Sequence, residues 1–149
     1  MTEVAFYHLQ RSRLEQVLPR LLEKTLGAGK RALVLSGSSD RVEQLNGVLW
    51  TYDPATWLPH GCDGDENPAD HPVWLSMRDD NVNDASFLFL TDGAGSAAIG
   101  EFERCFELFD GDDTDAVQRS RDRWKQYKSD GHDVTYWQQG DQGWAKQGA

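Results

Sequence analysis

The sequence predicts one α/β domain of three layers, in which helices cover both faces of a Rossmann-like, mostly parallel sheet. Three observations favour this fold class. Residues 3–9, 13–28 and 31–36 have the patterns of a strand, an amphipathic helix and a short buried strand, which is the order of a βαβ unit. A second helix pattern and several further strand patterns follow. The length of 149 residues suits a single domain, 1–149, that can bury a substantial core.

The opening strand, EVAFYHL at 3–9, alternates in hydrophobicity and is rich in strand-forming residues. The helix expected at 13–28 stops at Gly27 and Gly29. Its apolar face consists of Leu14, Val17, Leu18, Leu21, Leu22 and Leu26. Pro19 falls inside this pattern, so we expect either that the regular helix begins just before Pro19 or that the helix is kinked there.

The run RALVLS at 31–36 is short and mainly apolar, as in strands that are buried within parallel sheets. GSSD at 37–40 predicts a loop and a helix N-cap, and the second helix is expected to end before Asp53 and Pro54. Its apolar positions are Val42, Leu45, Val48 and Leu49. Residues 51–72 are acidic and rich in turn-forming residues, and they are predicted to form the long loop of the domain.

The second half of the chain alternates apolar runs with polar turns. In chain order we expect strands at 73–77 and 86–92, a short helical segment near 97–103, the strand RCFELFD, a long helix at 114–129 and a final edge strand at 134–137. Residues 139–149 are rich in glutamine and glycine, and they are predicted to form a loose C-terminal tail.

The chain is acidic, with 15 Lys and Arg against 25 Asp and Glu and a net charge of −10. Broad contact with DNA or with an anionic membrane requires a basic field over a whole face, so both are disfavoured as direct ligands. The two cysteines do not make a disulfide framework, and no apolar run is long enough to span a membrane. We therefore expect a reduced, cytoplasmic protein that meets DNA only indirectly, through another protein.

One stretch, RSRDRWKQYKSDGH at 119–132, holds five of the 15 basic residues. At helical spacing Arg121, Lys125 and Lys128 form one stripe, with Trp124 and Tyr127 beside it as an aromatic pair. A cationic surface with an aromatic floor suits an acidic peptide that ends in a free carboxylate. The same pattern also fits cations at a helix C-terminus above a core stripe of aromatic residues, and the composition leaves both interpretations open.

A second candidate surface contains Trp50, at the end of the second helix, and Trp57, in the loop that follows. Leu58, Pro59 and His60 continue this loop. Aromatic residues in loops often cover a core, but they are also enriched where proteins bind one another. The pattern allows either a lid on the core or a partner-binding surface.

The motifs of the common catalytic and cofactor sites are missing from the sequence. The glycines of GSS and DGAGSAAIG match neither GxGxxG nor GxxxxGK[ST], and there is no G-x-S-x-G elbow. Cys105 lies in an apolar strand, where a thiol is usually inert. His60, Cys62 and His71 do not have zinc-site spacing, and the acidic residues near them do not form an EF-hand. We expect no catalytic residues, no cofactor and no metal.

Two rival functions remain to be compared with the peptide-binding hypothesis. The first is a small nucleotide-dependent enzyme on the same scaffold, in which GSS or DGAGS would hold phosphate. The second is a direct single-strand binder that would use Trp124 and the basic helix. A net charge of −10 opposes the second, because such proteins line a long basic groove with stacking aromatics.

Several stretches carry a resemblance to a known family. They are the opening VAFYHL, the segment LPRLLEKTLGAGKRALVLSGSSDRVEQLNGVLWTYDPATWLPHG, the strand SFLFL and the closing RDRWKQYKSDGHDVTYW. Over nearly the whole chain these resemble the chi subunit family of bacterial DNA polymerase III holoenzyme. The resemblance implies a Rossmann-like domain without nucleotide or catalysis of its own. It also implies a bridge from the clamp-loader complex, through the psi subunit, to the acidic C-terminal tail of single-stranded DNA-binding protein.

The resemblance assigns the tail-binding arginine, aromatic residue and lysine of the family to Arg121, Trp124 and Lys125. Tyr127 and Lys128 continue that motif. Val117 stands where some relatives carry another basic residue, so the cationic rim is expected to be smaller and the tail to bind more weakly.

The resemblance also assigns the psi-facing surface. Trp50 and Trp57 match the aromatic positions associated with that surface, and Pro59 and His60 preserve the motif beside them. The family thus implies two separate protein-binding surfaces, one for the tail peptide and one for a second protein.

Overall fold

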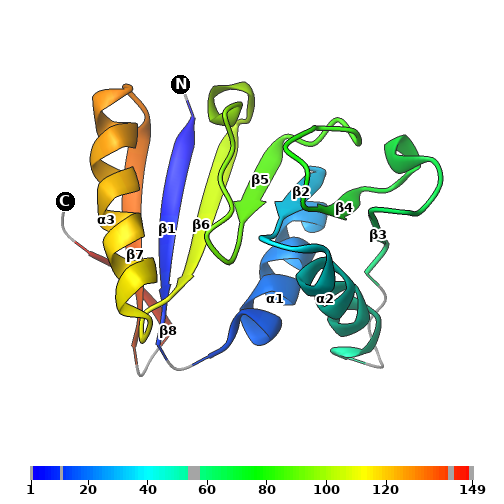
Figure 1. Ribbon diagram of the computed structural model, residues 1–149, viewed down its shortest axis with the longest axis horizontal. Helices are drawn as coiled ribbons and strands as arrows, with labels where there is room; N and C mark the ends of the chain where they lie inside the picture. Colours follow the sequence, from blue (N-terminus) through cyan, green and yellow to red (C-terminus); the bar gives the residue numbers. More distant parts are fainter. Residues whose placement is uncertain (1, 11, 54–57, 141–142, 148–149) are drawn as a thin grey trace.

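The computed structural model describes residues 2–10, 12–53, 58–140 and 143–147. Within this part of the chain, three α-helices flank an eight-stranded sheet (Figure 1). The strands are β1 (Glu3–Leu9), β2 (Ala32–Leu35), β3 (Gly61–Cys62), β4 (Val73–Ser76), β5 (Phe87–Leu90), β6 (Arg104–Asp110), β7 (Asp133–Gly140) and β8 (Gly143–Gln147). The α-helices are α1 (Leu14–Gly27), α2 (Ser39–Thr51) and α3 (Thr114–Ser129).

The strand order is β3-β4-β2-β5-β6-β1-β7-β8. All neighbouring pairs are parallel except β7 and β8, which are antiparallel. The central strands β2 and β5 read ALVL and FLFL and are buried on both faces, as expected when helices cover both sides of a parallel sheet. The predicted mostly parallel α/β sheet is therefore confirmed.

Neighbouring residues along the strands point to opposite faces and so build two core layers. In β1, Ala5 belongs to the layer covered by α1 and α2, whereas Val4 and Phe6 belong to the layer covered by α3. The three-layer architecture follows from this alternation. Figure 1 shows α3 beside β7 and β1, and α1 and α2 toward the other end of the sheet.

Side chains cap the starts of two helices, and the first of these caps lies in the predicted GSSD segment. The Ser38 hydroxyl accepts a hydrogen bond from the Arg41 amide at the start of α2, and the Asp113 carboxylate accepts from two amides at the start of α3. Helix α1 begins at Leu14 and continues through Pro19, which is buried. The prediction that the regular helix begins just before Pro19 is therefore wrong.

The C-terminal segment differs from its prediction. Strand β7 is longer than the predicted 134–137 strand, and residues 143–147 form β8 rather than a loose tail. Trp144 packs on Tyr7 with ring centroids 4.9 Å apart, and Trp137 lies 6.3 Å from the same ring. These aromatic contacts hold β8, whose sequence is otherwise polar, against the sheet. The edge strand on this side is therefore β8 and not the predicted β7.

Shorter elements also differ in detail. The loop predicted at 51–72 contains the two-residue strand β3, which pairs with β4, and a short 3-10 helix at Pro68–Asp70. The helical segment expected near 97–103 is a 3-10 helix at Ile99–Glu101. In the described part of the chain, no helix has both the length and the hydropathy needed to cross a membrane.

Candidate functional site

The carboxyl ends of β1 and β6 form the switch point of the sheet. These strands are neighbours, but the chain leaves β1 for a helix on one face and leaves β6 for a helix on the other face. Ligands of open α/β sheets commonly bind at such a point. A cleft of about 660 Å³ lies here, between the starts of α1 and α3.

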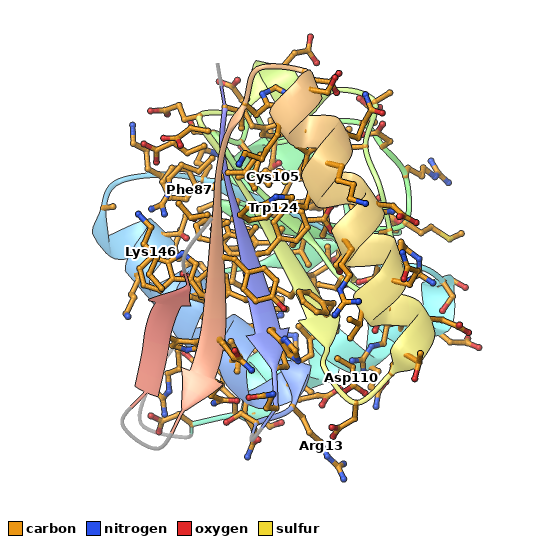
Figure 2. All side chains as sticks on the ribbon, turned by 90° about the vertical axis from the view of Figure 1, so that its left-hand side faces the viewer. Arg13, Phe87, Cys105, Asp110, Trp124 and Lys146 are labelled. Atoms are coloured by element: carbon orange, nitrogen blue, oxygen red, sulfur yellow. The ribbon has the colours of Figure 1, made fainter. Side chains whose placement is uncertain are left out.

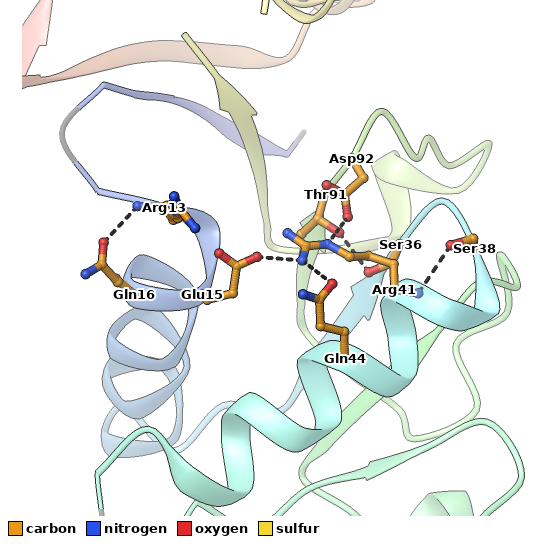
Figure 3. Close-up of polar contacts among 9 residues, drawn as sticks. All are labelled: Arg13, Glu15, Gln16, Ser36, Ser38, Arg41, Gln44, Thr91 and Asp92. Atoms are coloured by element: carbon orange, nitrogen blue, oxygen red, sulfur yellow. Dashed lines mark hydrogen bonds and ion pairs between the residues drawn. The ribbon is translucent and has the colours of Figure 1, made fainter. Parts of the chain in front are cut away.

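The cleft is lined largely by charged side chains. Its carboxylates are Glu15, Asp92, Asp110, Asp112 and Asp113, and its guanidinium groups are Arg13, Arg41 and Arg119. Arg41 is already engaged: its guanidinium lies 2.5 Å from Glu15 and 2.7 Å from Asp92, and it also donates to Gln44 (Figure 3). The remaining carboxylates repel a polyphosphate.

The two glycine-containing loops at this edge are tied to one another. The hydroxyls of Ser36 and Thr91 lie 2.8 Å apart in the core, and Arg41 joins the second loop through Asp92 (Figure 3). The Ser38 hydroxyl caps α2. The side chains of Ser36, Ser38 and Thr91 are thus engaged within the protein, which weighs against the nucleotide-dependent rival.

A different surface lies along α3 and contains most of the predicted peptide-binding residues. Arg121, Lys125 and Lys128 are exposed, and Trp124 is half-buried among them. The Lys128 ammonium lies 5.3 Å from the centre of the Trp124 ring. The structure therefore brings these four residues together in one patch, which we call the α3 surface.

The Trp124 ring is held in place from below. Its centroid lies 5.8 Å from that of Phe6 on β1 and 6.1 Å from that of Tyr136 on β7. Figure 2, viewed from the end of the sheet that carries α3, shows Trp124 between this helix and β7. An aromatic side chain fixed in this way offers apolar area at little cost in conformational entropy.

Tyr127 is not part of the α3 surface. Its side chain is 8% exposed, packs on Phe6, and donates its hydroxyl proton to Glu107 over 2.7 Å. Burial and the neighbouring Glu107 carboxylate raise the pKa of Tyr127. Along α3, Trp124 lies at the edge of the core and Tyr127 points into the core. Tyr127 is therefore not a candidate contact residue for the peptide.

Glu107 and Arg123 form an ion pair beneath α3 that the sequence pattern did not indicate. Glu107 is buried in β6, and burial raises its pKa despite the opposing effect of Arg123. The Arg123 guanidinium donates to Glu107 and also to the backbone carbonyls of Gly93 and Ala94. Arg123 thus fixes α3 to the loop after β5. One sequence feature could have indicated this pair: Glu107 lies within an apolar strand, and a buried glutamate requires a partner.

The second candidate surface lies at the other end of the sheet. Trp50 is 57% exposed at the end of α2, and its ring centroid lies 4.7 Å from that of His60. His60 is buried and its Nδ1 contacts the Leu58 carbonyl at 2.8 Å, while Pro59 is half-buried. Trp57 lies outside the described residues. Because Trp50 is exposed, it does not serve as a lid on the core.

The cysteines and histidines do not assemble into a reactive or metal-binding cluster within the described residues. Cys62 and Cys105 are both buried free thiols, and burial raises the pKa of each. No group of three or more His, Cys, Asp or Glu side chains is arranged to hold a metal ion in this part of the chain.

Residues 1–135 match the family described as DNA polymerase III chi subunit, HolC. The chain belongs to this family. It is also similar to a protein named "Probable DNA polymerase III subunit chi" from Rickettsia prowazekii (strain Madrid E). The two are 28% identical over 109 residues, which are 73% of this chain and 66% of that protein. The chain therefore spans about two thirds of the length of this relative.

Membership of this family confirms the resemblance to the chi subunit of DNA polymerase III that was found in the sequence. The chi fold in this chain presents two separate surfaces, one on α3 and one at the end of α2. The family name does not state the partners of these surfaces.

Proposed function

We propose that the α3 surface binds the acidic C-terminal tail of single-stranded DNA-binding protein. The observation that carries this proposal is the clustering of exposed Arg121, Lys125 and Lys128 around Trp124 in a chain of net charge −10. An acidic peptide is repelled by most of such a protein and attracted to this patch. The tail then binds where the local charge is reversed.

Each residue of the α3 surface has a separate part in this proposal. Arg121 is the donor for the terminal carboxylate, because a guanidinium can bind a carboxylate through two parallel hydrogen bonds. Trp124 supplies the apolar plane for the last side chain of the tail. Lys125 and Lys128 attract the acidic residues that precede it. Val117 is half-buried and adds no charge, so the rim has three cations.

The second surface, around Trp50 and His60, completes the proposed accessory role. We infer that it binds the psi subunit and so links the clamp loader to single-stranded DNA that carries the binding protein. Trp57 and Pro59 belong to the same proposed surface. An exposed tryptophan supported by a buried neighbour is typical of binding hot spots. In this role the chain has no catalysis or cofactor of its own and contacts DNA only through its partners.

Isothermal titration with two peptides tests the tail-binding proposal. The first peptide copies the last residues of the organism's own single-stranded DNA-binding protein, and the second lacks the final residue. We expect one-to-one binding of the first that weakens strongly for the second and falls with added salt, because a few exposed charge contacts are screened. Equal binding of both peptides, or no binding at low salt, would overturn the proposal.

A further inference from the structure

The α3 surface borders a tyrosine–histidine pair that the preceding proposal does not use. Tyr136 is half-buried on β7, and its ring meets that of Trp124 edge-on. The Tyr136 hydroxyl oxygen lies 2.6 Å from Nδ1 of His8 on the adjacent strand β1. Tyr136 is thus a direct neighbour of the aromatic residue of the α3 surface, with ring centroids 6.1 Å apart.

The position of the His8 ring is fixed by its surroundings. A Cβ at Gly111 would lie 2.0 Å from His8 Nε2, so only glycine allows the ring this place. The Phe109 ring lies 5.1 Å away, centroid to centroid. Nε2 is buried and has no hydrogen-bond partner among the described residues, although the Gly111 backbone is near. The contact with Tyr136 is therefore the polar contact that orients this histidine.

The charged groups around the pair come from three elements. Burial is the main cause that lowers the pKa of His8, and Arg121 on α3 lowers it further. The Gly111 backbone and the carboxylates of Asp112 and Asp110, at the end of β6, oppose this. Burial raises the pKa of Tyr136, and Arg121 opposes that shift. Arg121 is thus within electrostatic range of both the Tyr136 hydroxyl and the His8 ring.

We propose that Tyr136 is a further contact residue for the terminal carboxylate of the bound peptide, and that His8 is the positioning residue that directs the Tyr136 hydroxyl toward it. This inference rests on the proposed tail-binding function of the α3 surface. When Nδ1 of His8 carries a proton, it donates to the Tyr136 oxygen, and the hydroxyl hydrogen is free for an anion beside Arg121. When Nδ1 is bare, it accepts that hydrogen, and the hydroxyl is not available as a donor.

A pH dependence follows from this arrangement. Protonated His8 has a hydrogen on both nitrogens, so it always donates to Tyr136 and leaves the hydroxyl hydrogen for the carboxylate. Terminal carboxylates and aspartates of a peptide stay mostly ionised above about pH 5. Because burial lowers the pKa of His8 below 6.5, the effect develops in the acid range. We expect the peptide to bind about three- to tenfold more tightly near pH 5.5 than near pH 7.5.

Titration of the tail peptide at both pH values tests this inference in the full chain. Tyr136→Phe removes the hydroxyl and should bind about three- to tenfold more weakly near pH 5.5, with little change between the two pH values. His8→Asn places an amide near Nδ1 that can donate at any pH, so binding should persist without the pH dependence. Tyr52→Phe is the matched control, because its hydroxyl donates to Glu23, away from the α3 surface.

The outcomes separate this inference from the proposed function. If the unaltered chain binds the peptide but Tyr136→Phe keeps both its affinity and its pH dependence, the roles of Tyr136 and His8 are refuted and the tail-binding proposal stands. If the unaltered chain binds no peptide at either pH, the proposed function itself fails. Thermal unfolding of each variant checks its folding, and should His8→Asn unfold, Tyr136→Phe alone decides.

Discussion

The Tyr127 hydroxyl donates to the Glu107 carboxylate over 2.7 Å, so the helix that carries the candidate peptide-binding residues is bonded to a buried acid in the centre of the sheet. Arg123, one helical turn before Tyr127 in α3, donates a hydrogen bond to the same carboxylate. A buried carboxylate is stabilised only when such partners are present. The position of the α3 surface therefore depends on residues beneath it.

Tyr127→Phe should destabilise the protein by ~1.5 to 3 kcal/mol, because it removes a hydrogen bond to a buried charged group. Urea unfolding monitored by tryptophan fluorescence measures this change. Tyr52→Phe, which removes a hydroxyl bonded to Glu23 in a half-buried position, should cost less. Equal losses for the two variants would contradict the assigned importance of the Glu107 network.

The stability that Glu107 contributes should depend on pH. Its pKa is raised above 4.5 in the folded protein, chiefly by burial, so the folded state holds this proton more strongly than the unfolded state. Relative to Glu107→Gln, the unaltered chain should lose unfolding free energy as pH rises from about 4.5 through the folded pKa. Unfolding of both proteins at several pH values gives this difference, and a difference that grows with pH would show that the shift has the opposite sign.

Arg121→Ala should weaken binding of the tail peptide at least several-fold, because the terminal carboxylate loses its guanidinium partner. Arg119→Ala is the matched control on the same helix, since Arg119 lines the switch-point cleft instead of the α3 surface. Titration calorimetry at low and moderate salt compares the two. An unchanged affinity for Arg121→Ala would remove this residue from the site.

Trp50→Ala should leave peptide binding intact and weaken the binding of a psi subunit by tenfold or more. A tenfold loss corresponds to ~1.4 kcal/mol of binding free energy, which is typical of an aromatic hot spot. Co-purification and titration with the organism's psi protein measure the second effect. Loss of both activities in a folded variant would contradict the model of two separate surfaces.

Gly111→Ala should destabilise the protein by ~1 to 3 kcal/mol, because the added methyl group overlaps the His8 ring and must displace it. Gly47→Ala is the natural comparison: a Cβ there meets nothing within 4 Å, and the residue lies inside α2. Alanine in a helix interior is favoured over glycine, so this variant should gain ~0.5 to 1 kcal/mol. The two thermal shifts should therefore have opposite signs.

The sequence was sufficient for features that depend on local pattern. The α3 helix and its exposed cations follow from periodicity and charge over 16 residues. The same pattern could not separate Trp124 from Tyr127, because both lie beside the cationic stripe and only the packing against Phe6 and Glu107 decides which is buried.

Features made by residues distant in the chain were not predictable in this way. Strand β8 has few apolar residues, and its place in the sheet depends on the contact of Trp144 with Tyr7. Tyr136 joins the α3 surface because β7 pairs with β1 beneath the helix, and His8 reaches its hydroxyl from that neighbouring strand. These contacts require the register of the sheet, which hydrophobic alternation alone does not specify.

Strand β8 also covers the long edge of β7. Without it, the eight residues of β7 would present an open row of backbone donors and acceptors to other chains, as long exposed edge strands do. The sheet instead ends in five residues on this side, among them Lys146, and in the two residues of β3 on the other. Short and charged edges resist pairing between molecules, so a polar C-terminal segment keeps the sheet from growing into an intermolecular one.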